Sequence, residues 1–186
     1  MKPLSVALWL WLLPGLTEAA PARRPPLRVD SEIEYYLPTK TGRAIHTGFV
    51  NSVFGVDLLR GHLIIEAGVT MTVASGYINE DPTQHATVVG AGPIIMFRCE
   101  PFRIGPFSLL FDVVGALVVY SDNFPPGGDL YNFTWRLGGA FAVRLTERLT
   151  LTTGARWMHV SNGQGLTPKN PSYEGVGFPL GLLYRF

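Results

Sequence analysis

The chain has 186 residues, and its 15 Lys and Arg against 14 Asp and Glu give a formal net charge of +1, so no basic surface for nucleic acid is expected. Cys99 is the single cysteine, which excludes an internal disulfide. Hydrophobic residues make up 47% of the chain, yet after residue 22 no uncharged apolar run approaches the roughly 18 residues of a membrane-spanning helix. Helical membrane spans are therefore excluded.

The first residues have the pattern of a secretory signal peptide. A positively charged start precedes an apolar run over residues 4–16, and Ala20-Pro21-Ala22 supplies small residues at cleavage spacing. The alternative, a transmembrane anchor, is disfavoured because the run has only about 13 residues and contains Pro14. We expect residues 1–22 to be a signal peptide and residues 23–186 to form one domain.

Apolar residues then recur at every second position, which is the period of a β-strand whose two faces meet different surroundings. The clearest run covers residues 130–145, where large apolar side chains occupy the odd positions and polar or small side chains the even positions. Residues 107–120 and 63–73 show the same period. Each run therefore predicts a strand with one lipid-facing and one inward-facing side.

Turn residues between such runs delimit eight candidate strands. They lie at residues 30–38, 44–58, 61–76, 84–98, 103–120, 130–144, 147–161 and 174–186. The pattern predicts an all-β fold, an eight-stranded antiparallel transmembrane β-barrel. Side chains fill the interior of so small a barrel, so no pore is expected. The alternation leaves the register of the first two strands and of 84–98 open.

Three of these strands carry a charged residue on the inward face, namely Glu66, Asp112 and Arg136. An uncompensated charge in a filled interior is costly. We therefore expect Glu66 and Asp112 to pair with Arg136, Arg144 or Arg156.

The lengths of the connections orient the predicted barrel. Both termini of an even-stranded barrel lie on the periplasmic side, with short turns there and longer loops outside. The connection at Thr146-Glu147 is short and that over residues 162–173 is long. The seventh strand should therefore end near the outer surface, and the long loop should face the cell exterior.

Three polar residues fall on the lipid-facing side at this outer rim. Parity along the last two strands places His159, Ser161 and Glu174 there, where polar groups are costly unless they satisfy one another. Residues two apart on a strand share a face, which lets His159 reach Ser161, and the partner strand supplies the acid. Such a set can act as nucleophile, base and orienting acid. The alternative is that these are ordinary solvated residues at a barrel rim.

The segment Arg156-Trp157-Met158-His159-Val160-Ser161-Asn162-Gly163, followed by Asn170-Pro171-Ser172-Tyr173-Glu174 and a final aromatic strand, resembles the PagL-type lipid A 3-O-deacylases. These are eight-stranded outer-membrane barrels with an exterior hydrolase site. The resemblance covers about the last 35 residues.

The resemblance implies that Ser161 is the nucleophile, His159 the base, Glu174 the orienting acid and Asn162 a contributor to the oxyanion hole, with no metal or organic cofactor. Two features depart from the family pattern. Gly163-Gln164-Gly165 replaces a small residue followed by glycine, and the spacing from His to Glu is one residue longer.

The sequence thus predicts a serine esterase in the bacterial outer membrane that removes an ester-linked acyl chain from the lipid A of lipopolysaccharide, and the resemblance implies that this chain is the one at the 3-O position. We expect lipopolysaccharide as the substrate and outer-membrane lipid around the barrel, and we expect no nucleic-acid partner. Whether the protein forms a homodimer is left open by the sequence. The alternative is a non-catalytic small barrel with a structural or partner-binding role, and an acyltransferase barrel comes third. A terminal Phe186 after an aromatic strand resembles the signal read by the outer-membrane assembly machinery.

Overall fold

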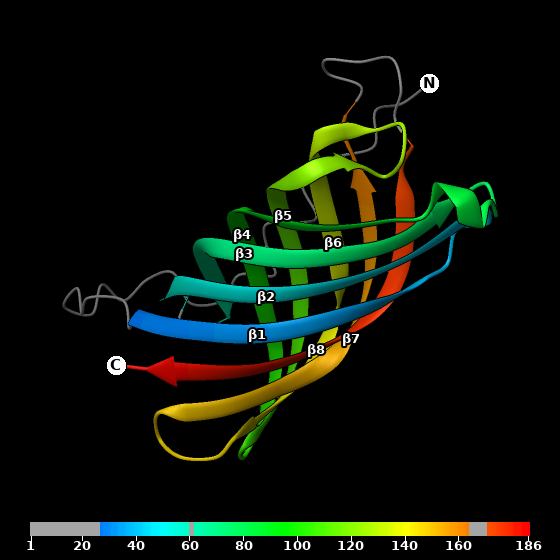
Figure 1. Cartoon of the computed structure of the whole chain (residues 1–186). Helices are drawn as coiled ribbons and strands as arrows, with labels where there is room; N and C mark the ends of the chain where they lie inside the picture. The colour runs from blue at the N-terminus through cyan, green and yellow to red at the C-terminus, as the bar shows by residue number, and fades with distance from the viewer. Residues whose placement is uncertain (1–26, 60–61, 164–170) are drawn as a thin grey trace, which may run out of the picture.

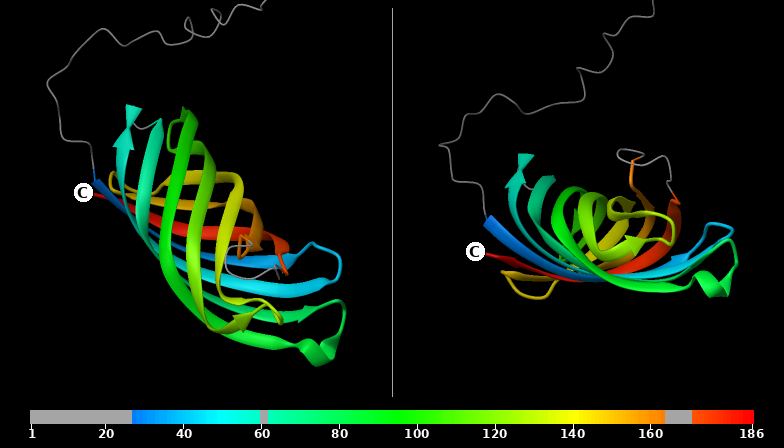
Figure 2. Two further views of the ribbon diagram at one scale, coloured as in Figure 1. Left: turned by 90° about the horizontal axis from the view of Figure 1, so that it is seen from above. Right: turned by 45° about the horizontal axis from the view of Figure 1, so that its top comes forward.

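The computed structural model describes residues 27–59, 62–163 and 171–186, which form one closed barrel of antiparallel strands. The strands are β1 (Leu27–Pro38), β2 (Arg43–Leu58), β3 (Leu63–Ile78), β4 (Ala86–Ile104), β5 (Phe107–Phe124), β6 (Asp129–Arg144), β7 (Leu149–Ser161) and β8 (Tyr173–Arg185). Each strand pairs with the next, and β8 pairs with β1 to close the barrel (Figures 1 and 2). The predicted all-β, eight-stranded antiparallel fold is confirmed. The expected signal peptide, residues 1–22, lies outside the described residues.

Several predicted strand boundaries were wrong, most clearly around the fourth and fifth strands. The fourth strand continues to Ile104 and the fifth begins only at Phe107, because Gly105, with φ of +59°, forms the turn between them. Residue 84 belongs to a short 3-10 helix, η4 (Pro82–Gln84), whose first turn is capped by the Asp81 side chain. In short polar stretches at strand ends, the alternation of apolar and polar residues does not show where the strand stops and the turn begins.

The two ends of the barrel differ in their connections. The start of β1 and the end of β8 lie together at one end, where Arg28 pairs with Arg185 in register. This end, at the left of Figure 1, also carries the connections between β2 and β3, between β4 and β5 and between β6 and β7. The opposite end carries the connections over residues 39–42, 79–85, 125–128 and 162–172, of which 79–85 and 162–172 are the two longest in the barrel. We call these the terminus end and the loop end.

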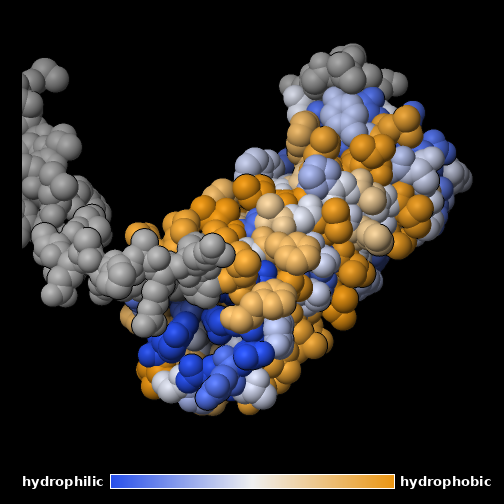
Figure 3. Space-filling model, turned by 90° about the vertical axis from the view of Figure 1, so that its left-hand side faces the viewer, coloured by the Kyte–Doolittle hydropathy of each residue, from blue (hydrophilic) through white to orange (hydrophobic). Residues whose placement is uncertain are grey.

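Side chains alternate between the outside and the interior along every strand. The expected parities of residues 63–73, 107–120 and 130–145 are confirmed, since Glu66, Asp112 and Arg136 are fully buried while large apolar side chains are exposed on the outside. Figure 3 shows that exterior as a predominantly apolar surface. No helix among the described residues is long and apolar enough to cross a bilayer.

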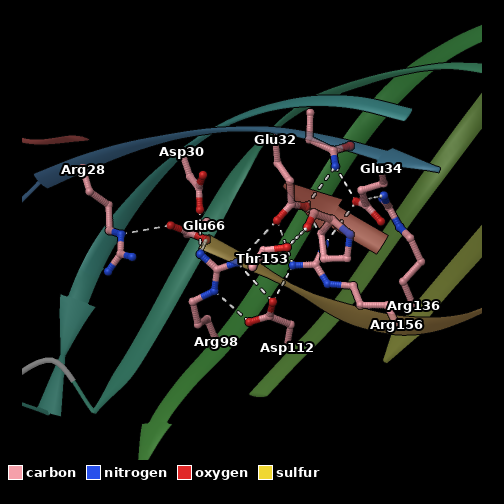
Figure 4. Close-up of polar contacts among 12 residues, drawn as sticks. Arg28, Asp30, Glu32, Glu34, Glu66, Arg98, Asp112, Arg136, Thr153 and Arg156 are labelled. Carbon is pink, nitrogen blue, oxygen red and sulfur yellow. Dashed lines mark hydrogen bonds and ion pairs between the residues drawn. The ribbon is translucent and has the colours of Figure 1, made fainter. Parts of the chain in front are cut away.

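Acidic residues of β1 are at the centre of a charged network in the interior (Figure 4). Asp30, Glu32 and Glu34 occur at every second position of β1 and are all buried. They form ion pairs with arginines from β4, β6 and β7, which are strands that do not neighbour β1 in the sheet. The acidic residues of β1 had not been predicted to point inward, because the register of that strand was open.

Arg98 makes the largest number of these pairs. It donates to Asp112 Oδ1 from Nε at 2.7 Å and to Asp30 Oδ2 from Nη1 at 2.6 Å. Arg156 donates to Glu32 and to Asp112 from the opposite side. The guanidinium groups and carboxylates therefore alternate in space, which offsets the cost of removing each from water.

The predicted partners of the inward acids were partly right. Asp112 does pair with Arg156, as expected. Glu66 pairs instead with Arg28, at 3.0 Å from Nε to Oε1. Arg144 lies outside the network, because it is exposed at the terminus end of β6 and donates to the carbonyl of Gly105.

An apolar cluster fills the loop-end half of the interior. Tyr36 and Phe49 pack edge to face at 5.8 Å between ring centroids, and the Arg136 guanidinium lies 4.4 Å from the Phe49 ring centroid. Gly177 leaves room for the Tyr36 ring, since a Cβ there would lie 2.5 Å from Tyr36 Cδ1. Tyr36 in turn donates a hydrogen bond to Glu34, which links the apolar half to the charged half.

We expect Arg98→Ala to destabilise the barrel by about 3–5 kcal/mol, because it leaves Asp30 and Asp112 buried beside too few cations. Denaturant unfolding of the purified protein, refolded in lipid, measures this. Arg148→Ala, in an exposed turn of the terminus end, is the control and should leave the unfolding free energy close to that of the wild type. Equal stability of Arg98→Ala and the wild type would contradict the network's role.

Candidate active site on the outside of the barrel

The ends of β7 and β8 place three polar side chains on the exterior at the loop end. In β7, Met158 and Val160 point inward and are fully buried, so His159 and Ser161 point outward. In β8, Tyr173 is buried and Glu174 points outward. His159 and Glu174 are direct partners in the register of the two strands. The structure therefore brings His159 and Glu174 together on one face and keeps Ser161 on it.

The His159 ring and the Glu174 carboxylate are within hydrogen-bonding distance. Nδ1 of His159 lies 3.3 Å from Oε1 of Glu174, and the two side chains are 30% and 31% exposed. A proton on Nδ1 would be donated to the carboxylate, which leaves Nε2 as the basic nitrogen. This is the tautomer that a serine hydrolase needs, because the base must accept the hydroxyl proton while the acid fixes the ring.

Ser161 lies two residues beyond His159 on the same outward face, half-buried. Two strand residues span about 6.6 Å, a distance that the imidazole can bridge toward a serine hydroxyl. Within the described ranges, no hydrogen bond joins Ser161 to His159. Catalytic hydrogen bonds are often long in the absence of substrate and tighten in the complex, so this spacing is compatible with a nucleophile and its base.

Aromatic side chains surround this polar group. The Trp157 and His159 rings are stacked with centroids 5.9 Å apart and an interplanar angle of 29°. On β6, Trp135 pairs with His159 and Phe133 pairs with Ser161, and both aromatic side chains are exposed on the outside. The polar residues thus lie in an apolar exterior, where a lipid would exclude water and strengthen their interactions.

Asn162 is placed differently from the other three predicted residues. Its side chain is 1% exposed and donates from Nδ2 to Asp129 Oδ2, at the start of β6. The amide group is therefore directed away from the face of Ser161. Any contribution of Asn162 to an oxyanion hole would come from its backbone N–H. The neighbouring Gln164 and Gly165, where the family pattern differs, lie outside the described residues.

A second serine and histidine pair occurs on the exterior, and sequence reasoning missed it. Ser75 Oγ of β3 lies 3.4 Å from Nε2 of His85 and 2.7 Å from Oγ1 of Thr87. His85 follows η4 in a loop, so parity along a strand gave no signal for the contact. In the described part of the chain His85 makes no ion pair with a carboxylate, which distinguishes it from His159.

The molecule is thus a closed eight-stranded barrel with a histidine and carboxylate pair and a serine on its outer face. No known family model matches the chain, and no curated protein matches its sequence at a significant level. No group of three or more metal-binding side chains occurs among residues 27–59, 62–163 and 171–186. The function therefore has to be argued from the geometry.

We expect Ser161→Ala and His159→Ala to retain the folded barrel, with a change in unfolding free energy of about 0.5 kcal/mol or less, because both side chains point outward and no interior cavity opens. Met158→Ala, one residue away but pointing inward, should cost about 2–5 kcal/mol. Heat-modifiable migration and denaturant unfolding measure both. Equal effects at 158 and 159 would show that the parity of β7 is wrong.

Proposed function

We propose that this protein is an outer-membrane serine esterase that hydrolyses an ester-linked acyl chain, at the 3-O position, of lipid A in lipopolysaccharide. The observation that carries the proposal is the contact of His159 with Glu174 on the outside of the barrel, with Ser161 on the same face. The resemblance of residues 156–163 and 170–174 to the PagL-type deacylases supports it.

The barrel's surface supports the membrane location. A closed barrel leaves no strand edge unpaired, which is a requirement for crossing a bilayer with β-strands. Large apolar side chains project outward from all eight strands, while the charged network fills the interior. The signal-peptide pattern of residues 1–22 supports export of the chain, which an outer-membrane location requires.

The catalytic steps follow from the roles of the three residues. His159 Nε2 accepts the Ser161 proton as Oγ attacks the ester carbonyl, and Glu174 stabilises the imidazolium that forms. His159 then returns the proton to the departing alcohol, which leaves an acyl group on Ser161. Water, activated by the same nitrogen, releases the fatty acid and restores the serine.

The position of the site favours a lipid over a soluble substrate. Ser161 and His159 lie among aromatic side chains on the exterior, so a lipid can approach laterally within the bilayer. The loop end carries the two longest connections, 79–85 and 162–172, and the longer loops of such barrels usually lie outside the cell, which supports a site at the outer leaflet. Lipopolysaccharide is the main lipid of that leaflet, and its lipid A carries ester-linked acyl chains.

Purified protein incubated with lipopolysaccharide should release free fatty acid and leave lipid A lighter by one acyl chain, as measured by mass spectrometry. Ser161→Ala and His159→Ala should each abolish the release, with losses of about 10³-fold or more. Glu174→Ala should be milder, because the orienting acid of a triad contributes less than the nucleophile or the base.

Ser75→Ala is the matched control, because Ser75 is also an exterior serine beside a histidine. It should keep full activity. Full activity in Ser161→Ala would refute the hydrolase and favour a non-catalytic barrel. Transfer of the acyl chain to an acceptor, without free fatty acid, would favour an acyltransferase.

A further inference from the structure

We propose that the terminus end of the barrel holds a binding site for a phosphate group, at the end opposite the candidate active site. A small pocket with a cavity volume of about 20 Å³ opens there into the barrel interior. Figure 3 looks at this end and shows a patch of strongly hydrophilic residues within the otherwise apolar surface. The site is independent of the esterase chemistry.

Four arginines line the pocket: Arg28 of β1, Arg103 of β4, Arg144 of β6 and Arg185 of β8. They come from four strands, so the closure of the barrel brings them together. Arg103 points inward because a β-bulge between Cys99 and Phe102 shifts the register of β4 against β5. A bulge re-aims side chains in this way, and here it puts Arg103 beside Glu100 of the same strand.

Two of the four guanidinium groups are already neutralised by carboxylates. Arg103 donates two hydrogen bonds to Glu100, from Nε at 2.5 Å and from Nη2 at 2.7 Å. Arg28 pairs with Asp57 at 2.6 Å and with Glu66 at 3.0 Å. These pairs account for the acidic groups that face the pocket.

The other two arginines have no carboxylate close enough to neutralise them fully, so they leave the pocket with excess positive charge. Arg185 reaches a carboxylate only at 3.7 Å, from Nε to Asp57 Oδ2. The Arg144 side chain makes no ion pair with a described residue, and its one hydrogen bond to a described residue is a 3.4 Å contact with the carbonyl of Gly105. Both therefore retain guanidinium N–H groups for a bound anion.

Two buried hydroxyl groups also line the pocket without a partner. Thr150 is 5% exposed and Thr152 is 2% exposed, and neither Oγ1 has a hydrogen-bond partner. A buried hydroxyl without a partner is costly, so it indicates a missing ligand or water. Thr150 lies directly opposite Arg144 in the register of β6 and β7, which brings the hydroxyl to the unpaired arginine.

A phosphate group fits this set of donors better than a carboxylate does. It has several acceptor oxygens in a tetrahedral arrangement and carries up to two negative charges. This matches two hydroxyl donors and two arginines, one without an ion pair to a described residue and one with only a 3.7 Å pair. Guanidinium groups bind phosphate in a planar, bidentate geometry. Inorganic phosphate and the headgroup of a lipid share this chemistry.

The test titrates inorganic phosphate into the purified full chain in neutral detergent and follows binding by calorimetry, with chloride at equal ionic strength as the reference. Saturable phosphate binding is expected in the wild type. Arg144→Gln and Arg185→Gln should each weaken it about ten-fold or more, since each removes charge-assisted hydrogen bonds. Arg148→Gln is the matched control, because that side chain bonds the Tyr184 hydroxyl outside the pocket, and it should bind as the wild type does.

Thr150→Val separates ligand binding from structural damage. It removes the unpartnered hydroxyl at nearly constant volume, so it should weaken phosphate binding several-fold and leave the barrel no less stable in phosphate-free buffer. Binding no different from chloride, equal losses in Arg148→Gln and Arg144→Gln, or unchanged binding in Thr150→Val would each overturn the proposal.

Repeating the titration in bilayer discs identifies the source of the phosphate. In discs of phosphatidylcholine, inorganic phosphate should bind as in detergent. If added phosphatidic acid displaces it in the wild type but not in Arg144→Gln, the site takes a lipid headgroup. If phosphate still binds unchanged, the site takes the free ion, and either result leaves the site in place.

Discussion

The pairing of charges inside the barrel is the constraint on which the rest of the structure depends. A barrel of eight strands has an interior filled by side chains, and here the filling includes fully buried arginines and carboxylates. Each charge is tolerated only because opposite charges from across the barrel surround it. Asp112, for example, is held between Arg98 and Arg156, which joins β5 to β4 and β7. The network therefore fixes the relation of strands that are not neighbours.

The fixed register has a consequence on the outside of the barrel. Successive side chains of a strand point to opposite faces, so a residue held inward by the network makes its two chain neighbours point outward. In β7 the inward Arg156 and Met158 leave His159 facing out, and closure of the sheet through β8 places Glu174 beside it. A polar side chain on an apolar exterior costs free energy unless it is hydrogen-bonded, and the contact between His159 and Glu174 lowers that cost. A rigid interior thus positions an exterior site without any contribution from a flexible loop.

The sequence predicted the closed eight-stranded fold and the outward face of His159, Ser161 and Glu174, because strict alternation carries that information along a single strand. It did not predict the partners of Glu66, since these depend on which side chains meet across the barrel. The bulge near Cys99 and the contact of Ser75 with His85 were also missed, because neither follows the period of two. The direction of Asn162 was not predictable for a related reason: the strand ends at Ser161, and parity does not extend beyond it.

Covalent labelling with a lipid-soluble fluorophosphonate, followed by peptide mass spectrometry, tests the central claim most directly. Such a probe phosphonylates only a serine whose hydroxyl is activated by a neighbouring base. We expect a label on Ser161 of the folded protein in detergent or bilayer, and we expect this label to be lost in His159→Ala and kept in Ser75→Ala. A label on Ser75 instead, or no label on Ser161 in the folded wild type, would contradict it.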